Sequence, residues 1–187
     1  VAWENSSVVA WENSSVVAWE NSSVVANGNS QIVDRLRGGK IQILGNARTV
    51  YMPKTIDDFM SFYGIKHTKT KATFYKAVHK RDEKYIADHD NKFEYLIGKT
   101  AKVSDININT FKTCGNGLHI SHLDWALRFG ESWKDLAILK VETAIDDIVM
   151  PVDTNGKVRM SKIKVLEEVP LEDCGVYGKI LAKRASQ

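Results

Sequence analysis

The chain begins with an alternation of apolar and polar positions that repeats every eight residues. The octapeptide Val-Ala-Trp-Glu-Asn-Ser-Ser-Val occurs three times over residues 1–24 and continues in degenerate form to residue 52. Each copy joins a short apolar run to a polar Glu-Asn-Ser-Ser corner, which is typical of a strand followed by a turn. One copy cannot bury its apolar side alone, so the copies must stack. We therefore expect an all-β solenoid, or a β-prism of several chains, over residues 1–52.

The tryptophan of each copy predicts how this segment associates. Stacked octapeptide rungs about 4.8 Å apart would place Trp3, Trp11 and Trp19 in one exposed aromatic ladder. Large exposed apolar patches mark interfaces, and an uncapped strand edge can pair with another chain. We therefore expect the chain to form a homo-oligomer through residues 1–52, with these three tryptophans at the interface.

The octapeptide pattern ends near residue 52, and residues 53–187 form a second predicted domain. Thr55 is a suitable N-cap for a short helix over residues 56–63, and Ser-x-x-Asp at residues 121–124 predicts a capping box for another helix. Residues 174–183 are apolar enough to pack as either a strand or a helix. Strands outnumber helices without alternating regularly with them, which indicates a small α+β domain. The strands are predicted from apolar, β-rich runs at residues 72–78, 93–97, 117–121, 136–141 and 163–166.

Charge and hydropathy narrow the range of partners. The only charged residues among the first 32 are Glu4, Glu12 and Glu20, which give that segment a charge of −3. Because the whole chain has a net charge of +3, the remaining residues carry +6. Its lysines are scattered among carboxylates and form no basic stripe, which argues against nucleic acid. No apolar run approaches the roughly 18 residues of a membrane helix, so no membrane partner is expected. Two widely separated cysteines favour a reducing compartment.

The densest polar cluster is Cys-Gly-Asn-Gly-Leu-His-Ile-Ser-His at residues 114–122. A strand here places His119 and Ser121 on one face, and Gly117 allows a ligand to approach the backbone closely. A nucleophilic pair of Cys114 and His119 is one alternative. A metal site is another, with Cys114, His119, His122 and Cys174 as ligands, but their spacing matches no familiar zinc pattern and we assign no metal ligand. Half-buried histidines bonded to backbone groups are the commoner arrangement.

The order of these segments resembles an uncharacterised domain family found in phages and bacteria. The resemblance runs from residue 72 to residue 183 and rests on Phe-Tyr-Lys-Ala-Val at 74–78, the segment 93–99, the glycine-rich cluster at 114–121, the Asp-Trp-Ala-Leu helix and the strand at 137–142. Members of that family often carry short Val/Ala/Asn/Ser repeats. The resemblance implies a viral, bacteriophage origin, and hence a location in the cytoplasm of a bacterial host or in the virion.

More distantly, the same order resembles an ADP-ribosyltransferase. That resemblance implies ligand binding by Lys76 or His79 on the first strand. It also implies catalytic roles for His119 and Ser121 on a middle strand, and for Glu142 or Glu172 as the later carboxylate. The cofactor would then be NAD.

Two hypotheses follow. The first is a non-enzymatic, oligomeric structural and interaction protein of phage type, which uses no cofactor and whose repeat segment displays a domain that binds a host or virion protein. The alternative is an NAD-dependent ADP-ribosyltransferase-like enzyme, or a degenerate nucleotide-binding relative. The sequence does not decide whether the chain is an enzyme.

Overall fold

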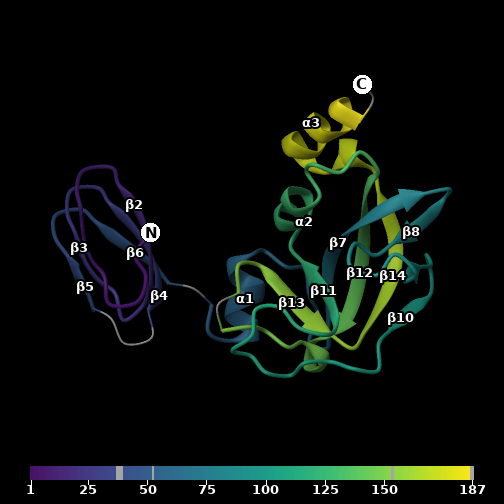
Figure 1. Ribbon diagram of the computed structural model, residues 1–187, viewed down its shortest axis with the longest axis horizontal. Helices are drawn as coiled ribbons and strands as arrows, with labels where there is room; N and C mark the ends of the chain where they lie inside the picture. The colour runs from purple at the N-terminus through teal and green to yellow at the C-terminus, as the bar shows by residue number, and fades with distance from the viewer. Residues whose placement is uncertain (37–39, 52, 153, 186–187) are drawn as a thin grey trace. The chain divides into compact units, whose positions relative to one another are not determined.

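The computed structural model describes residues 1–36, 40–51, 53–152 and 154–185 (Figure 1). The chain divides into two compact units, Val1–Pro53 and Lys54–Gln187. They differ in architecture.

The first unit consists of two three-stranded parallel sheets. Strands β1 (Ser7–Ala10), β3 (Ser23–Ala26) and β5 (Lys40–Ile43) form one sheet, and strands β2 (Ser15–Glu20), β4 (Gln31–Leu36) and β6 (Arg48–Tyr51) form the other. Ser7 pairs with Ser23, and Ser15 pairs with Gln31, so neighbouring strands are separated by two octapeptides. Consecutive octapeptides therefore contribute to different sheets.

A tight corner closes each octapeptide. In the first copy the amide of Ser6 donates to the carbonyl oxygen of Trp3 at 3.1 Å, and the Ser6 hydroxyl donates to the same oxygen at 2.6 Å. The residue after the tryptophan adopts a left-handed backbone, with φ of 54°, 55° and 54° in the three exact copies. Glycine takes this place in the degenerate copies, at Gly28 and Gly45. The Glu-Asn-Ser-Ser segment therefore is a turn, as its composition predicts.

The interior of this unit is narrow because its residues are small. Its buried cluster consists of Ala10, Val16, Ala18, Val24, Ala26, Ile32 and Ala47. The tryptophans do not form one ladder. Trp3 stacks on Trp19, with ring centroids 4.9 Å apart and planes 4° apart, whereas Trp11 follows β1 in the other sheet and corresponds to Asn27 in the next layer.

The second unit is built on an eight-stranded antiparallel sheet. Six strands lie in the order β10 (Thr100–Lys102), β14 (Lys162–Val169), β12 (Leu136–Ala144), β7 (Lys71–Arg81), β11 (Leu118–Ser121) and β13 (Lys157–Met160). Strand β8 (Lys84–Ile86) pairs with the end of β7 and with β9 (Glu94–Tyr95). The long strands β7, β12 and β14 run side by side through the sheet (Figure 1).

Helices cover both faces of this sheet. Along β7, Phe74 and Val78 belong to a large core that includes Phe59 and Met60 of α1 (Ile56–Phe62). Ala77 points to the opposite face and packs with α2 (Leu123–Phe129) and α3 (Gly175–Ala185). Two short 3₁₀ turns, η1 (Ile145–Asp147) and η2 (Leu171–Asp173), precede β13 and α3. The alternation along β7 thus separates two packed layers.

The fold class expected from the sequence, a β-solenoid or β-prism followed by a small α+β domain, is wrong as stated. The repeats do not form a single stack of one-octapeptide rungs, because hydrogen bonding joins every second copy and splits the strands between two parallel sheets. The second unit is an eight-stranded antiparallel sheet with three α-helices among the described residues.

Two helix starts were predicted, and one is confirmed. Thr55 caps α1, since its hydroxyl accepts a hydrogen bond from the Asp58 amide at 3.1 Å and its own amide donates to the Asp58 carboxylate at 3.2 Å. The predicted capping box at Ser121 is not formed, so this prediction is wrong. Ser121 is the last residue of β11, paired with Lys157 and Tyr75, and the N-cap of α2 is His122, which makes no side-chain capping bond.

Candidate functional site

A pocket of about 710 Å³ opens where the sheet of the second unit splits. Strand β11 pairs with β13 along its whole length, from Leu118 to Ser121. On its other side it pairs with β7 only between Ser121 and Tyr75 in the described part of the chain. Beyond that pair the two strands separate, so residues from both strands line the pocket. Its volume lies in the range of small-molecule sites.

The pocket combines aromatic walls with charged groups of both signs. The aromatic side chains come from β7, the loop and strand around β9, and one face of α2: Tyr75, Phe93, Tyr95, Trp125 and Phe129. Three lysines and three aspartates also line it: Lys76, Lys102, Lys157, Asp88, Asp90 and Asp105. A ligand here therefore meets ring faces, cations and hydrogen-bond acceptors together.

Lys76 occupies a position that the strand pattern assigns to the core. It follows Phe74 and precedes Val78 on the same face of β7, and both neighbours are fully buried. Its Nζ donates to the backbone oxygen of His119 at 2.9 Å, across the split, and lies 5.2 Å from the centre of the Tyr95 ring. Burial lowers the pKa of Lys76 to about 8, the charge of Asp88 opposes this change, and the charge of Lys157 adds to it.

His119 faces the same pocket from β11. Its Nε2 is buried and has no hydrogen-bond partner among the described residues. Burial lowers the pKa of this imidazole to about 4, with further lowering by the nearby cations, Lys157 first and then Lys76. At neutral pH the ring is therefore uncharged and presents one donor and one acceptor nitrogen.

A third group of the pocket is Lys157 on β13, which contacts the loop that precedes β11. The Lys157 ammonium donates to the Cys114 sulfur at 3.1 Å and lies 5.3 Å from the centre of the Trp125 ring. A thiol is a weak hydrogen-bond acceptor. Lys157 therefore retains most of its capacity to bind an anion.

Arg159 holds the loop that forms one wall of the pocket. Its side chain is completely buried, and its guanidinium donates to the carbonyl oxygens of Asn107, Asn109 and Lys112. Burial lowers the pKa of this guanidinium. The loop held in this way supplies Asp105, Cys114, Gly115 and Asn116 to the pocket. Arg159 thus supports the site without lining it.

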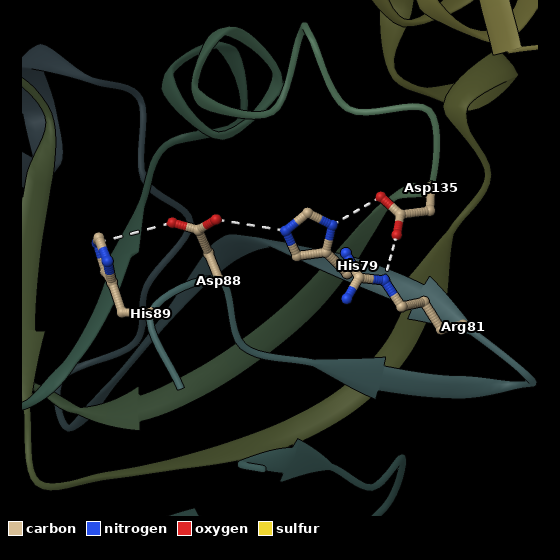
Figure 2. A network of polar contacts seen from close by, with 5 residues as sticks. All are labelled: His79, Arg81, Asp88, His89 and Asp135. Atoms are coloured by element: carbon tan, nitrogen blue, oxygen red, sulfur yellow. Dashed lines mark hydrogen bonds and ion pairs between the residues drawn. The ribbon is translucent and has the colours of Figure 1, made fainter. Parts of the chain in front are cut away.

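A polar network continues from the pocket rim along β7 (Figure 2). His79 lies between two carboxylates, with Nδ1 2.6 Å from Asp135 and Nε2 3.3 Å from Asp88. Asp135 also accepts a hydrogen bond from Arg81 Nε at 2.6 Å, and His89 lies 3.7 Å from Asp88. Burial raises the pKa of Asp135, but the bonds from His79 and Arg81 outweigh it and leave the pKa below its usual value.

The structure brings together most, but not all, of the predicted site residues. Lys76, Gly117, His119 and Ser121 line the pocket. His79 does not line it but contacts Asp88, which does. Glu142 lies away from the pocket, where its carboxylate pairs with Lys71 at 2.8 Å. Trp3 and Trp11 are 57% and 59% exposed in the first unit.

The four residues considered as metal ligands are divided between two pockets. Cys114 and His119 line the pocket described above. His122 and Cys174 line a second pocket of about 480 Å³, where His122 stacks on Tyr63 with ring centroids 4.6 Å apart. No group of three histidine, cysteine or acidic residues in the described part of the chain could hold a metal ion.

Sequence reasoning missed several residues of this site. Trp125 and Phe129 were expected on a helix, but nothing indicated that their stacked rings, 5.0 Å apart, face a pocket. Lys157 and Arg159 lie on β13, which was not predicted as a strand. Arg159 did carry a signal, since it stands between the apolar residues Val158 and Met160, and all three are buried.

Comparison with known proteins shows a partial relation to a phage protein. The chain is 31% identical to Protein rIIB of Enterobacteria phage T4 over 88 residues, which are 46% of this chain and 28% of the phage protein. The chain therefore matches less than a third of that relative's length. No family model and no solved structure matches. These findings support a bacteriophage relation and give none to an ADP-ribosyltransferase.

None of the helices in the described residues has the length and apolar character needed to cross a lipid bilayer.

Proposed function

We propose that the second unit is a ligand-binding module, and that the chain acts as an interaction protein of phage type. The ligand that fits best has an aromatic ring, hydroxyl groups and an anionic group, as nucleotides and other aromatic phosphates do. The observation that supports this proposal is the split between β7 and β11, which places aromatic rings, lysines and an unpartnered imidazole in one pocket.

Each part of such a ligand has a counterpart in the pocket. The aromatic wall that includes Trp125 and Phe129 suits an aromatic base, because contact with aromatic rings contributes about 1–3 kcal/mol per base. Lys157 suits a phosphate, since its present acceptor is only the Cys114 thiol. The aspartates suit sugar hydroxyls, which can donate to carboxylates. His119 Nε2 would gain the partner that it lacks.

Calorimetric titration of the full chain with AMP tests the proposal. We expect binding that weakens at least about tenfold in Trp125→Ala and in Lys157→Ala, since each loses roughly 1.4 kcal/mol or more of contact. Lys164→Ala is the matched control, because Lys164 is an exposed lysine of β14 outside the pocket. If AMP, GMP, CMP, UMP and a further aromatic phosphate, pyridoxine phosphate, all fail to bind the unaltered chain, the proposal is wrong.

A second proposal concerns the first unit, through which we expect copies of the chain to associate. It is supported by Trp3 and Trp11, which expose more than half of their surface. Exposed aromatic surface of this kind marks protein interfaces. Association would array the pockets and raise the avidity for a host or virion protein that carries several ligand groups.

Sedimentation velocity tests this second proposal. The unaltered chain should sediment as an oligomer, and the double variant Trp3→Ser/Trp11→Ser should shift toward a monomer. Ile108→Ser is the control, since Ile108 is 75% exposed but belongs to the second unit. A concentration-independent monomer of the unaltered chain would remove the proposal.

The geometry favours binding over NAD-dependent ADP-ribosyl transfer. His119 and Ser121 share the pocket, but neither Glu142 nor Glu172, the two candidates for the later carboxylate of a transferase, lines it, and Glu142 pairs with Lys71. Release of nicotinamide from NAD by the purified chain, lost in His119→Ala, would reverse this preference.

A further inference from the structure

We propose that Lys76 forms an imine with a carbonyl group of the ligand held between β7 and β11. This inference rests on the proposed ligand-binding function and adds to it a chemical class: the ligand is an aromatic anion that carries an aldehyde or ketone. Three features of the site support it, and each is independent of the comparisons with other proteins.

The first feature is the position of the side chain. Lys76 projects from the core face of β7, between the buried residues Phe74 and Val78, where strand alternation places apolar side chains. Its nitrogen nevertheless lines the pocket and approaches the Tyr95 ring. A lysine in this place is held at the floor of the pocket, unlike the mobile lysines of a protein surface.

The second feature is the set of partners of the nitrogen. It donates a hydrogen bond to the His119 backbone oxygen, a neutral acceptor that the splitting of the sheet leaves without a strand partner. In the described residues no carboxylate lies at ion-pair distance from this ammonium. Lys80 on the same strand, by contrast, pairs with Glu168 at 2.9 Å. Lys76 therefore lacks the contact that normally keeps a lysine charged.

The third feature is the electrostatic environment. Burial, opposed by the charge of Asp88 and aided by that of Lys157, brings the pKa of Lys76 to about 8, so about a tenth of this side chain is free amine at pH 7. A desolvated lysine beside another cation is the arrangement that activates amines for imine formation.

The reaction needs no oxidant or reductant. The Lys76 nitrogen attacks the carbonyl carbon, and the electron pair of the broken C=O π bond moves to oxygen, which takes a proton. The carbinolamine then loses its hydroxyl group together with the remaining nitrogen-bound proton as water, and a C=N double bond remains. One amine and one carbonyl thus give one imine and one water, and water reverses the step.

Two matched probes separate this inference from the function on which it rests. Pyridoxal phosphate is an aromatic anion with an aldehyde, and pyridoxine phosphate is nearly the same molecule with an alcohol in its place. The full chain is incubated with pyridoxal phosphate near neutral pH, reduced with cyanoborohydride and mapped by peptide mass spectrometry. We expect labelling at Lys76 to be at least about tenfold faster than at Lys164, with a pH midpoint near 8, and to be slowed by excess pyridoxine phosphate.

The variant Lys76→Arg should remove this label while retaining the fold, since arginine keeps a charged donor for the His119 carbonyl; circular dichroism checks the fold. Labelling spread evenly over surface lysines, while pyridoxine phosphate still binds by calorimetry, overturns the imine alone. Failure of both probes and of the nucleotides to bind overturns the proposed function as well.

Discussion

The two units of this chain use their residues in opposite ways. In the first unit, identical octapeptides place similar small side chains inside and tryptophans outside in successive layers, and the only charges of residues 1–32 are three glutamates at the corners. In the second unit, strands of unequal length leave a gap beside β11, and Lys76 and Arg159 carry charge into buried positions. The repeats of the first unit use the same packing in each layer. In the second unit, irregular strand pairing creates a site, and the charges buried there reduce stability locally.

The buried charged residues near the pocket should therefore have the largest influence on the stability of the second unit. A buried cation without a carboxylate partner destabilises the fold unless backbone groups satisfy it. Arg159 is satisfied by three carbonyls, and Lys76 by one. Removing the charge should therefore lower the free energy of unfolding at Arg159 and raise it at Lys76.

Arg159→Met should give the largest effect. It leaves the carbonyls of Asn107, Asn109 and Lys112 without their charged donor, and each such bond contributes about 1.5–3 kcal/mol. We expect the free energy of unfolding of the second unit to fall by about 3 kcal/mol or more, measured by urea titration with tryptophan fluorescence. Lys164→Met serves as the control. An unchanged midpoint would show that the loop does not depend on Arg159.

Lys76→Met should instead stabilise the chain near neutral pH. The pKa of Lys76 is lower in the folded state, about 8, than its ordinary value of 10.5, so below pH 8 the folded state bears the full cost of holding the charge. That cost corresponds to at most about 3 kcal/mol, and loss of the bond to His119 offsets about 1 kcal/mol of it. As the pH rises from 8 toward 10.5 the stability of the unaltered chain increases, because the unfolded state binds more protons.

The difference between Lys76→Met and the unaltered chain should therefore be greatest near neutral pH and shrink toward pH 10. Urea unfolding at several pH values measures it. A difference that does not change with pH would mean that the methionine acts by packing alone.

The smallest expected effects lie at the corners of the first unit. Glu12 has φ of 55°, which a side chain disfavours, so Glu12→Gly should stabilise this unit by about 0.5 kcal/mol after the entropy of glycine is counted. Gly28→Ala should destabilise it by about 1–2 kcal/mol, since φ is 66° and the new Cβ would lie 2.9 Å from the Glu12 backbone. Thermal unfolding of the two variants tests both predictions. A shift of the unfolding temperature in the same direction for both variants would contradict them.

Local structure was readable from the sequence where short-range chemistry decides it. The Thr55 cap, the corners at Glu-Asn-Ser-Ser and the apolar runs of β7, β12 and β14 all follow from residues close together in the chain. The Ser121 box failed because its serine is engaged in strand pairing with Lys157, a residue far along the sequence. Long-range pairing overrode a local signal there.

The pocket and the arrangement of the repeats depend on pairing that no local pattern encodes. An octapeptide pattern is compatible with stacking of every copy or of every second copy, and the parallel registers show the latter. The gap beside β11 arises because, in the described residues, this strand pairs with β7 only at its last residue, Ser121. One long-range clue was available: Lys76 interrupts the apolar face of its strand, as a residue with a task other than packing would.

The pairing of octapeptides two apart makes the array tolerant of changes in its length. Because the three exact copies are identical, inserting or deleting one of them would leave each later strand with a partner of the same sequence. The number of exact copies can therefore change without altering the register in which β4, β5 and β6 are paired.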